Sequence, residues 1–563
     1  MKKLLLSLML GMCVQGALAQ SKAFTGTVLD PLHEPVIGAT VQLDGTNKKT
    51  VTDLDGKFSF SDVPANATVT ISYIGMKPVT RKLSGSSMTF SMEDENKSLN
   101  EVVVIGYGTA KAKDLTSPIS VVKAEDIANV PATSPMTALQ GKVAGVNVVN
   151  SGTPGAGPTV RIRGNGSFSN SNPLYVVDGM FYDNINFLNP SDIKDMSILK
   201  DASAAAIYGV RAANGVVIIT TKNGGRNQKV QVTYDGYVGV QKATNVLKMA
   251  NSSQYGQMLM EANYDVYSPY LKASIDRFGG SYADSDFHNW TYGSDTDWYD
   301  ELLRTAVITN HAVTVSGGSD KASYSVGMSY LYQNGIMDVD NDYGRLNFRA
   351  ALDFQATSWL KIGYNGVYSH SNQTNPNNAA WQKAFNAPGI YPVYDENNTE
   401  ATPVKFASPS SVGFTNNFYN PVALAYYYNS KNRTSQFLNN YYMDLTFIPE
   451  KLHFKSSVSY DHSTIEGYTF LPKYYISAQL HTDNSGLTKA MTTYNNYVWD
   501  NTLNYNDTFG KHNLGLMLGY SMRQEKYHIL NGYANNVPDG KEEYWYVNQG
   551  DEASRKSSED AYT

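Results

Sequence analysis

Apolar and polar side chains alternate with a period of two over most of the chain after residue 229. Around Val326, for example, Tyr324 and Val326 share one face of a candidate strand, whereas Ser323 and Ser325 share the other. The candidate strands are as long as a tilted strand needs to be to cross a membrane, roughly 9–11 residues. The same alternation recurs around Val232, Phe348, Ile362 and Leu516.

The connections between these strands alternate between short turns and long polar stretches. Short turns on one side and long loops on the other are typical of an outer-membrane barrel. A soluble β-sandwich also alternates apolar and polar faces, but it does not require such one-sided loop lengths. The pattern therefore predicts a partial transmembrane antiparallel β-barrel of about nine or ten strands over residues 229–563. The short turns lie at 317–320, 356–358 and 449–451, and the long stretches lie near 241–308, 371–435 and 462–494.

The aromatic residues are concentrated in the same half of the chain. Only five of the 41 tyrosines precede residue 229, and all six tryptophans lie at or beyond Trp290. Aromatic belts at the two interfaces of a membrane produce such a bias. A secreted sugar-binding β-protein is also rich in tyrosine, so the bias supports the barrel without excluding that alternative.

Residues 1–19 have the pattern of a secretory signal peptide. Lys2 and Lys3 supply positive charge, an apolar run follows, and Ala17-Leu18-Ala19 provides a cleavage site. The single cysteine, Cys13, lies inside this segment, so we expect no disulfide and no thiolate metal site in the mature chain. No later segment holds ~20 consecutive apolar residues, so we expect no helical membrane span. A net charge of −6 argues against a nucleic-acid partner.

Two further domains precede the barrel-like half. Residues 22–98 contain short strands separated by turn signals such as Asp55-Gly56, which predicts a mainly β domain, a β-sandwich. Residues 110–226 mix short helical and strand patterns and are predicted to form an α+β domain. Within this domain an apolar strand ends at Asp178-Gly179, and Pro190-Ser191-Asp192 is expected to open a helix with Ser191 or Asp192 as its N-cap.

The continuous stretch 174–224 resembles the plug-domain signature of the SusC/RagA family of TonB-dependent outer-membrane transporters. The N-terminal sandwich resembles the carboxypeptidase-regulatory-like domain that precedes the plug in many members of this family. The resemblance implies that residues 110–226, the plug, fill the lumen of the barrel. Since plugged transporters have ~22 strands, we expect this sequence to be truncated and to lack the C-terminal half of the barrel.

Residues 99–109 resemble the TonB box of the same family. A short strand-prone run is followed by a flexible Gly-Tyr-Gly. An extended segment of this kind can add to the edge of a partner's sheet through main-chain hydrogen bonds. A buried strand of the neighbouring domain is the alternative. The residues assigned to the box are Glu101, Val102, Val103, Val104, Ile105, Gly106 and Tyr107.

Candidate binding residues lie in the plug and in one long loop. Arg161 and Arg163 share a strand face, and the resemblance implies that they pair with carboxylates of the barrel wall; ordinary solvated arginines are the alternative. Trp381, Tyr427 and Tyr428 could stack on sugar faces, or pack within the loop instead. The sequence holds no HExxH, Walker A or GxSxG motif, and we expect no catalytic residues, no metal and no cofactor.

The resemblance implies active import of a bulky nutrient, a glycan or a peptide, across the outer membrane. The plug would be gated by TonB, which is energised by its inner-membrane partners, and a SusD-like surface lipoprotein would cap the outer face. The plug and the N-terminal domain would face the periplasm. The alternatives are a cell-surface binding or adhesion protein without transport, a siderophore receptor, and a secreted carbohydrate-active enzyme.

Overall fold

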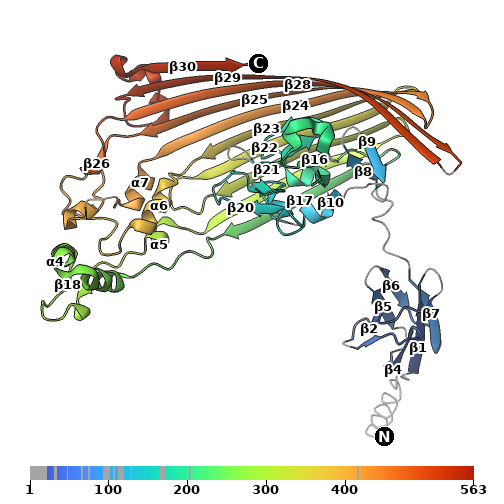
Figure 1. Ribbon diagram of the computed structural model, residues 1–563, viewed down its shortest axis with the longest axis horizontal. Helices are drawn as coiled ribbons and strands as arrows, with labels where there is room; N and C mark the ends of the chain where they lie inside the picture. Colours follow the sequence, from blue (N-terminus) through green and yellow to red (C-terminus); the bar gives the residue numbers. More distant parts are fainter. Residues whose placement is uncertain are drawn as a thin grey trace, which may run out of the picture. The chain divides into compact units, whose positions relative to one another are not determined.

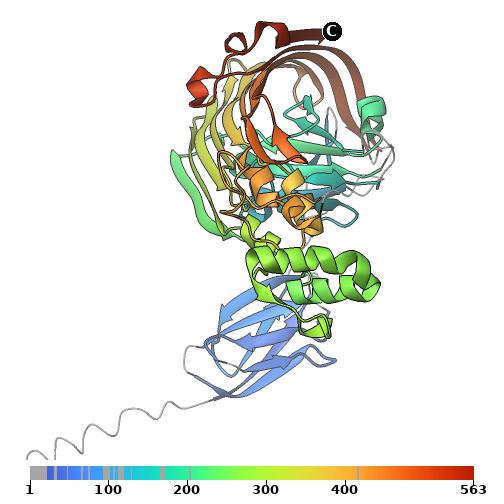
Figure 2. The ribbon, with the colours of Figure 1, turned by 90° about the vertical axis from the view of Figure 1, so that its left-hand side faces the viewer.

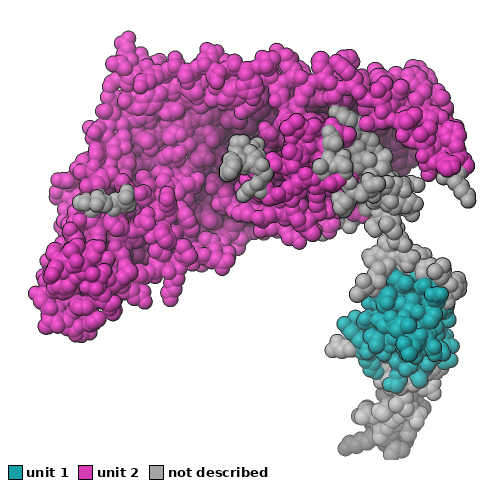
Figure 3. Space-filling model, in the orientation of Figure 1, with its two compact units in different colours: residues 1–104, 108–116 teal, residues 105–107, 117–563 magenta. Residues whose placement is uncertain are grey.

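The chain divides into two compact units, which are described separately (Figure 3). The first holds residues 1–104 and 108–116, and the second holds residues 105–107 and 117–563. The predicted signal peptide lies outside the described residues. The computed structural model describes residues 22–30, 34–46, 48–64, 67–73, 76–92, 102–105, 108–111, 119–128, 130–164, 171–201, 205–414, 418–510 and 512–563.

The first unit contains a sandwich of two small β-sheets, as predicted. One sheet has the strand order β4-β1-β7 and the other has the order β3-β2-β5-β6. Aromatic side chains fill its core: the Phe58 ring lies 6.3 Å from Phe24 and 5.8 Å from Phe90, and all three are buried. The strands are β1 (Lys22–Leu29), β2 (Thr40–Leu43), β3 (Lys49–Val51), β4 (Lys57–Val63), β5 (Thr68–Tyr73), β6 (Met76–Lys82) and β7 (Ser87–Ser91).

The plug is built on a mixed five-stranded sheet with the order β10-β15-β16-β13-β14. Its apolar core also includes Val367, Leu438 and Val498, which come from the surrounding wall. The elements are β10 (Ile119–Lys123), α2 (Ala124–Ala128), η2 (Thr137–Leu139), β11 (Asn147–Val149), β12 (Thr159–Arg161), β13 (Leu174–Val177), β14 (Met180–Tyr182), η3 (Pro190–Asp192), β15 (Ile193–Leu199), η4 (Ala206–Ala212) and β16 (Val216–Thr221).

The helix predicted to begin at Pro190 is wrong beyond its first turn. η3 is a single 3-10 turn whose N-cap is Asn189, not Ser191 or Asp192. The chain then enters β15, which lies between β10 and β16 and pairs with both. Pairing on both sides of a buried strand outweighs the local helical preference of a seven-residue segment.

Ten antiparallel strands form one continuous sheet, the wall, among the described residues. The wall curves around the plug (Figures 1 and 2). This arrangement confirms the partial barrel and the number of strands expected for it. The strands, in sheet order, are β17 (Gln231–Gln241), β20 (Ala306–Gly318), β21 (Ala322–Asn334), β22 (Asp342–Gln355), β23 (Leu360–Thr374), β24 (Asn429–Ile448), β25 (Leu452–Leu471), β28 (Gly486–Phe509), β29 (His512–Asn535) and β30 (Lys556–Tyr562).

Most wall strands are longer than the sequence pattern predicts. β24 and β25 have 20 residues each, and β28 and β29 have 24 each. Many of the additional residues are polar, and the sequence pattern therefore predicts long loops there, although Lys431 to Gln436 pair along β23. Backbone hydrogen bonding continues past the end of the apolar pattern because it does not depend on which side chains are present.

The burial of the wall inverts the usual order of a soluble protein. On β21, Val326 and Met328 are each 49% exposed, whereas Ser325 is 1% exposed. On β22, Phe348 and Leu352 are exposed, whereas the polar residues Arg345, Asn347 and Arg349 are buried. The wall thus has an apolar outer face and a polar inner face, as the alternation predicted.

The long loops between wall strands fold into helices and hairpins around a common apolar core that includes Tyr391 and Phe406. Figure 1 shows them gathered at one end of the wall. None of the helices in the described part of the chain has the length and apolar character needed to span a membrane. The elements are α4 (Ser252–Phe278), β18 (Gly280–Ser281), η5 (Phe287–Asn289), β19 (Thr291–Tyr292), α5 (Trp298–Leu302), α6 (Ala379–Asn386), η6 (Pro409–Val412), α7 (Pro421–Tyr426), β26 (Tyr474–Ser477) and β27 (Leu480–Thr482); η7 (Glu542–Tyr544), η8 (Val547–Gln549) and η9 (Glu552–Ser554) precede β30.

Replacement of Phe58 by Ala is expected to destabilise the N-terminal sandwich by ~3–5 kcal/mol, because the ring fills the centre of its aromatic core. Urea unfolding followed by circular dichroism measures the change. Leu54→Ala is the matched control, since Leu54 is 79% exposed. Equal losses of stability for the two variants would contradict the assignment of this core.

Candidate functional site between plug and wall

Several buried polar residues join the plug to the inner face of the wall, and we call five of them the seam: Asn189, Asp192, Asn310, Asn347 and Arg349. Asn189 Nδ2 donates a hydrogen bond to Asn310 Oδ1 at 3.0 Å. Asn347 Nδ2 donates to a plug carbonyl oxygen at 2.8 Å, and Arg349 Nε lies 3.8 Å from Asp192 Oδ1. Breaking these contacts without water would leave buried polar groups unpaired, which is costly.

Local structure explains how the seam residues reach one another. As the N-cap of η3, Asn189 Oδ1 accepts hydrogen bonds from the backbone N–H and the hydroxyl of Ser191. The cap occupies the acceptor and leaves the amide donors free to reach the wall. Arg345, Asn347 and Arg349 share a face because alternate residues of β22 point the same way.

Arg345 fixes two plug loops from the same strand face. It is 2% exposed, and its Nη1 donates to the carbonyl oxygens of Asn186 and, at 3.4 Å, Thr133. A guanidinium with several donors in a fixed plane can bridge separate backbone segments in this way. The wall therefore holds the plug partly through main-chain atoms.

Asp178 joins two strands inside the plug. It occupies the turn between β13 and β14 with φ +46°, and its carboxylate accepts hydrogen bonds from Thr221 N at 3.1 Å and Thr221 Oγ1 at 2.7 Å. Burial raises the pKa of Asp178, while the Thr221 hydrogen bonds and Arg349 oppose the shift. Burial also raises the pKa of Asp192, against the attraction of Arg349.

A hollow of about 350 Å³ lies between the plug and strands β22 to β30. Amide and hydroxyl groups predominate in its lining, which also includes six charged residues. Arg211 of the plug lies 3.0 Å from Asp183 and 2.8 Å from Glu525 of β29. Within the described residues, no group of three or more His, Cys, Asp and Glu side chains is placed to hold a metal ion. The hollow can therefore offer hydrogen bonds and local charge to a polar solute.

The predicted TonB box falls partly outside the described residues. Glu101, Gly106 and Tyr107 lie outside them. The backbone of the remaining residues forms β8 (Val102–Ile105), which pairs with β9 (Gly108–Lys111) in a two-stranded sheet. The strand-prone run is thus a strand, and its role in energy coupling stays a prediction.

The two plug arginines have hydrogen-bond partners within the plug. Arg161 Nη1 donates to Asn172 Oδ1 at 2.6 Å, and Arg163 Nε donates to the carbonyl oxygen of Lys200 at 2.8 Å. Their pairing with carboxylates of the wall stays a prediction.

The loop aromatics proposed for sugar binding differ in their surroundings. Tyr427 is buried and stacks on Tyr474 with ring centroids 4.2 Å apart; burial raises the pKa of Tyr427 to about 12. Trp381 is 39% exposed and packs against Tyr299, and Tyr428 is half-buried. The contacts of Tyr427 are those of a packed loop residue, and sugar binding by the three aromatics stays a prediction.

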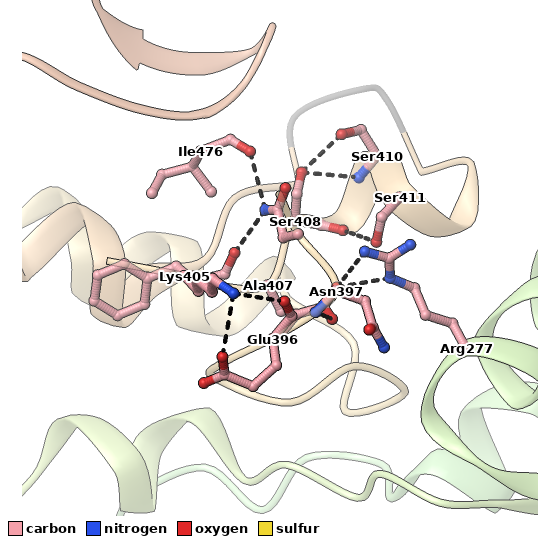
Figure 4. A network of polar contacts seen from close by, with 12 residues as sticks. Arg277, Glu396, Asn397, Lys405, Ala407, Ser408, Ser410, Ser411 and Ile476 are labelled. Atoms are coloured by element: carbon pink, nitrogen blue, oxygen red, sulfur yellow. Dashed lines mark hydrogen bonds and ion pairs between the residues drawn. The ribbon is translucent and has the colours of Figure 1, made fainter. Parts of the chain in front are cut away.

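A polar network joins residues from three of the long loops (Figure 4). Arg277, near the end of α4, places Nε and Nη2 each 2.6 Å from Asp395 Oδ2. Asn398 Nδ2 donates to the carbonyl oxygens of Phe406 at 2.8 Å and Ile476 at 3.2 Å. These contacts hold the three loops together as one folded unit, which we call the loop module.

The sequence pattern did not identify the seam. The alternation around Phe348 predicts that Arg345, Asn347 and Arg349 share the polar face of one strand, but nothing in the chain order indicates that Asn189 and Asp192 lie opposite them. The available signal was the presence of two arginines on the inner face of a barrel strand, because a buried guanidinium requires partners.

Arg349→Met is expected to destabilise the plug–wall assembly by ~3–5 kcal/mol, because it leaves Asp192 as an unpaired buried carboxylate. The double variant Arg349→Met/Asp192→Asn should recover most of this loss. Thermal unfolding of the detergent-solubilised protein measures both. If the double variant were no more stable than the single variant, the pair would not couple plug to wall.

Asp178→Asn is expected to remove a pH dependence of stability. Because the folded state raises the pKa of Asp178, it binds the proton more tightly than the unfolded state, so this group's contribution falls as pH rises from ~4 through the raised pKa. Unfolding midpoints between acid and neutral pH should therefore converge in the variant. The exposed Asp126→Asn is the control, and an unchanged slope in Asp178→Asn would contradict the prediction.

Two family models match consecutive parts of the chain. A carboxypeptidase-regulatory-like domain matches residues 24–104, and a TonB-dependent receptor plug domain matches residues 111–216. Among curated proteins, the chain is 31% identical over 569 residues to the TonB-dependent receptor SusC of Bacteroides thetaiotaomicron. That match covers 95% of this chain and 53% of SusC.

Further relatives agree with this match. The chain is 32% identical to the TonB-dependent receptor P26 of Formosa agariphila over 89% of this chain and 49% of the receptor. The chain thus spans about half the length of the curated relatives it matches. A structure of the RagAB peptide importer in its open-open state has a similar fold, with a TM-score of 0.65 and 23% identity over 82% of this chain and 53% of that chain. Together, the plug domain, the regulatory-like domain and the match over 95% of this chain identify it as a homologue of the TonB-dependent receptor SusC.

Proposed function

We propose that this chain forms the plug-bearing part of an outer-membrane transporter that imports a bulky hydrophilic nutrient. The observation that carries the proposal is the inverted wall: its apolar face is outside, its polar face is inside, and a folded plug occupies the inner side. An apolar belt suits contact with lipid, whereas a polar inner face suits passage of a water-soluble solute.

The presence of the plug favours regulated import rather than free passage through an open pore. It is held to the wall by buried hydrogen bonds and by the Arg349–Asp192 pair, so its displacement requires work. In the proposed mechanism, TonB pairs with the segment at β8 through main-chain hydrogen bonds and transmits this work to the plug. Solute would bind between the loops, the plug and the wall before the plug moves.

A glycan and a peptide are both candidate cargoes. The amide- and hydroxyl-rich lining of the hollow, with Gln373, Gln436 and Asn496, suits the hydroxyls of a sugar and the main chain of a peptide. We propose a SusD-like lipoprotein as the partner on the outer face, where the ordered loop module would offer a firm docking surface. The plug and the N-terminal domain would face the periplasm.

Deletion of Val102–Ile105 is expected to abolish uptake without abolishing binding. The variant would be made in a receptor of the relatives' full length that carries these residues. Uptake and surface binding would be measured in cells with panels of fluorescent neutral oligosaccharides and fluorescent oligopeptides. Loss of uptake to the level of cells lacking TonB, with surface binding retained, is the expected result.

A same-length replacement of these four residues by Gly-Ser-Gly-Ser separates the effect of sequence from that of spacing. It should behave like the deletion, because the strand-prone side chains are lost. Uptake at the unmodified level in either variant would show that this segment does not couple energy to the plug. Absence of uptake of every probe by the unmodified receptor would contradict transport itself.

A further inference from the structure

Two glutamines of the wall form hydrogen bonds to a glycine-rich turn of the plug, residues 153–157. Gln373 Nε2 on β23 donates to the carbonyl oxygen of Pro154 at 2.7 Å. Gln333 Oε1 on β21 accepts from the backbone N–H of Gly155 at 3.1 Å, and Gln333 Nε2 donates in turn to Gln241 at 3.1 Å. We call Gln333 and Gln373 the glutamine clamp. Both side chains are uncharged, and both bind only main-chain atoms of the turn.

The turn fits closely against the wall at one glycine. Gly155 has φ +70°, and a Cβ built there would lie 2.2 Å from Cδ2 of the Tyr343 ring. No side chain other than hydrogen is therefore tolerated while the turn is seated and the tyrosine is present. Pro154 is buried beside it. The turn therefore has one closely fitted position against the wall.

The clamp lies at the border of the hollow. Gly155, Tyr343 and Gln373 all contribute to its lining, together with Ser371 of the same strand as Gln373. A solute that occupies the hollow reaches the amide of Gln373 and competes with Pro154 for its donors. Occupancy of the hollow and release of the turn are therefore linked through one side chain.

The clamp and the seam differ in what their rupture costs. The hydrogen bonds of the clamp are neutral, and water from the adjoining hollow can replace them at small cost. Rupture of the seam separates Asp192 from Arg349 where both are buried, which costs more because each charge loses its partner away from water. Force or ligand applied to the plug will therefore open the weaker attachment first.

We infer that the 153–157 turn is the release point of the plug, and that solute in the hollow frees it from the glutamine clamp while the seam stays closed. The inference rests on the proposed function. It adds that the glutamine clamp opens before the seam and that Gln373 is the wall side chain that contacts the solute. Gln333 and Gln373 are positioning residues in this account, since they act through the turn.

A reversible lock tests the inference. The Cβ position of Gly155 lies 2.5 Å from Cγ of Tyr343, so cysteines at 155 and 343 come within reach of a disulfide, whose Cβ atoms are ~3.8 Å apart. Cys13 is the only cysteine of this sequence and lies in the predicted signal peptide, so this part of the mature receptor adds no competing thiol to the engineered pair. Gly155→Cys/Tyr343→Cys is expected to lose uptake of the oligosaccharide and oligopeptide probes when oxidised and to regain it with dithiothreitol.

The single variant Tyr343→Cys, which keeps Gly155, is the matched control, and its uptake should not differ between oxidising and reducing conditions. Uptake by the reduced double variant shows that this variant folds and transports. If that variant transports and its oxidised form transports equally well, the turn is not the release point, although the proposed function stands. If neither the reduced variant nor the unmodified receptor transports any probe, the proposed function fails.

A second measurement does not depend on uptake. Pro154→Cys reports the turn and Ser325→Cys reports the wall face near the seam, where the native serine is 1% exposed. In purified receptor, a soluble maleimide should label position 154 faster than position 325, and an oligosaccharide or peptide probe that binds should widen the difference. Equal labelling rates at the two positions, with and without probe, would overturn the inference.

Discussion

The inverted polarity of the wall is the constraint on which the rest of this structure depends. A sheet whose outer face carries Val326, Met328 and Phe348 must turn its polar side chains inward. Those inward groups need partners, and the plug supplies them through side chains such as Asn189 and through its own backbone carbonyls. The plug is therefore more than a stopper of suitable size, because it satisfies the hydrogen-bonding groups that the lumen would otherwise leave to water.

The same constraint produces two kinds of attachment. Where wall and plug exclude water, contacts are buried and include the Arg349–Asp192 pair. Where they leave a hollow, the clamp contacts are neutral, the Arg211–Glu525 pair is partly exposed, and all of them border on space that a solute can fill. A transporter requires both properties, since a plug held only by strong contacts would not open and one held only by weak contacts would leak. The loops at one end of the wall are held together separately, by contacts such as Arg277–Asp395.

Much of this architecture could be predicted from the sequence, because a period of two is a local property of the chain. The alternation around Val326 predicts the wall and which of its faces is apolar, and the turn signals near Asp55 predict the sandwich. Strand ends were less accurate, because pairing of Lys431 to Gln436 continues where the apolar pattern stops. β15 was assigned to a helix, since its strand character comes from the neighbours β10 and β16. The seam could not be predicted, because it joins residues more than a hundred positions apart, as Asn189 and Asn310 show.

The central claim is that the wall presents its apolar face to lipid. Spin labels placed one at a time along β21, from Ser323 to Tyr332, test it most directly in reconstituted bilayers. The account predicts collision with oxygen at Val326, Met328 and Tyr330, protection at Ser325 and Ser329, and hence an accessibility profile with a period of two. A water-soluble nickel chelate that reached Val326, Met328 and Tyr330 as readily as oxygen does would contradict it.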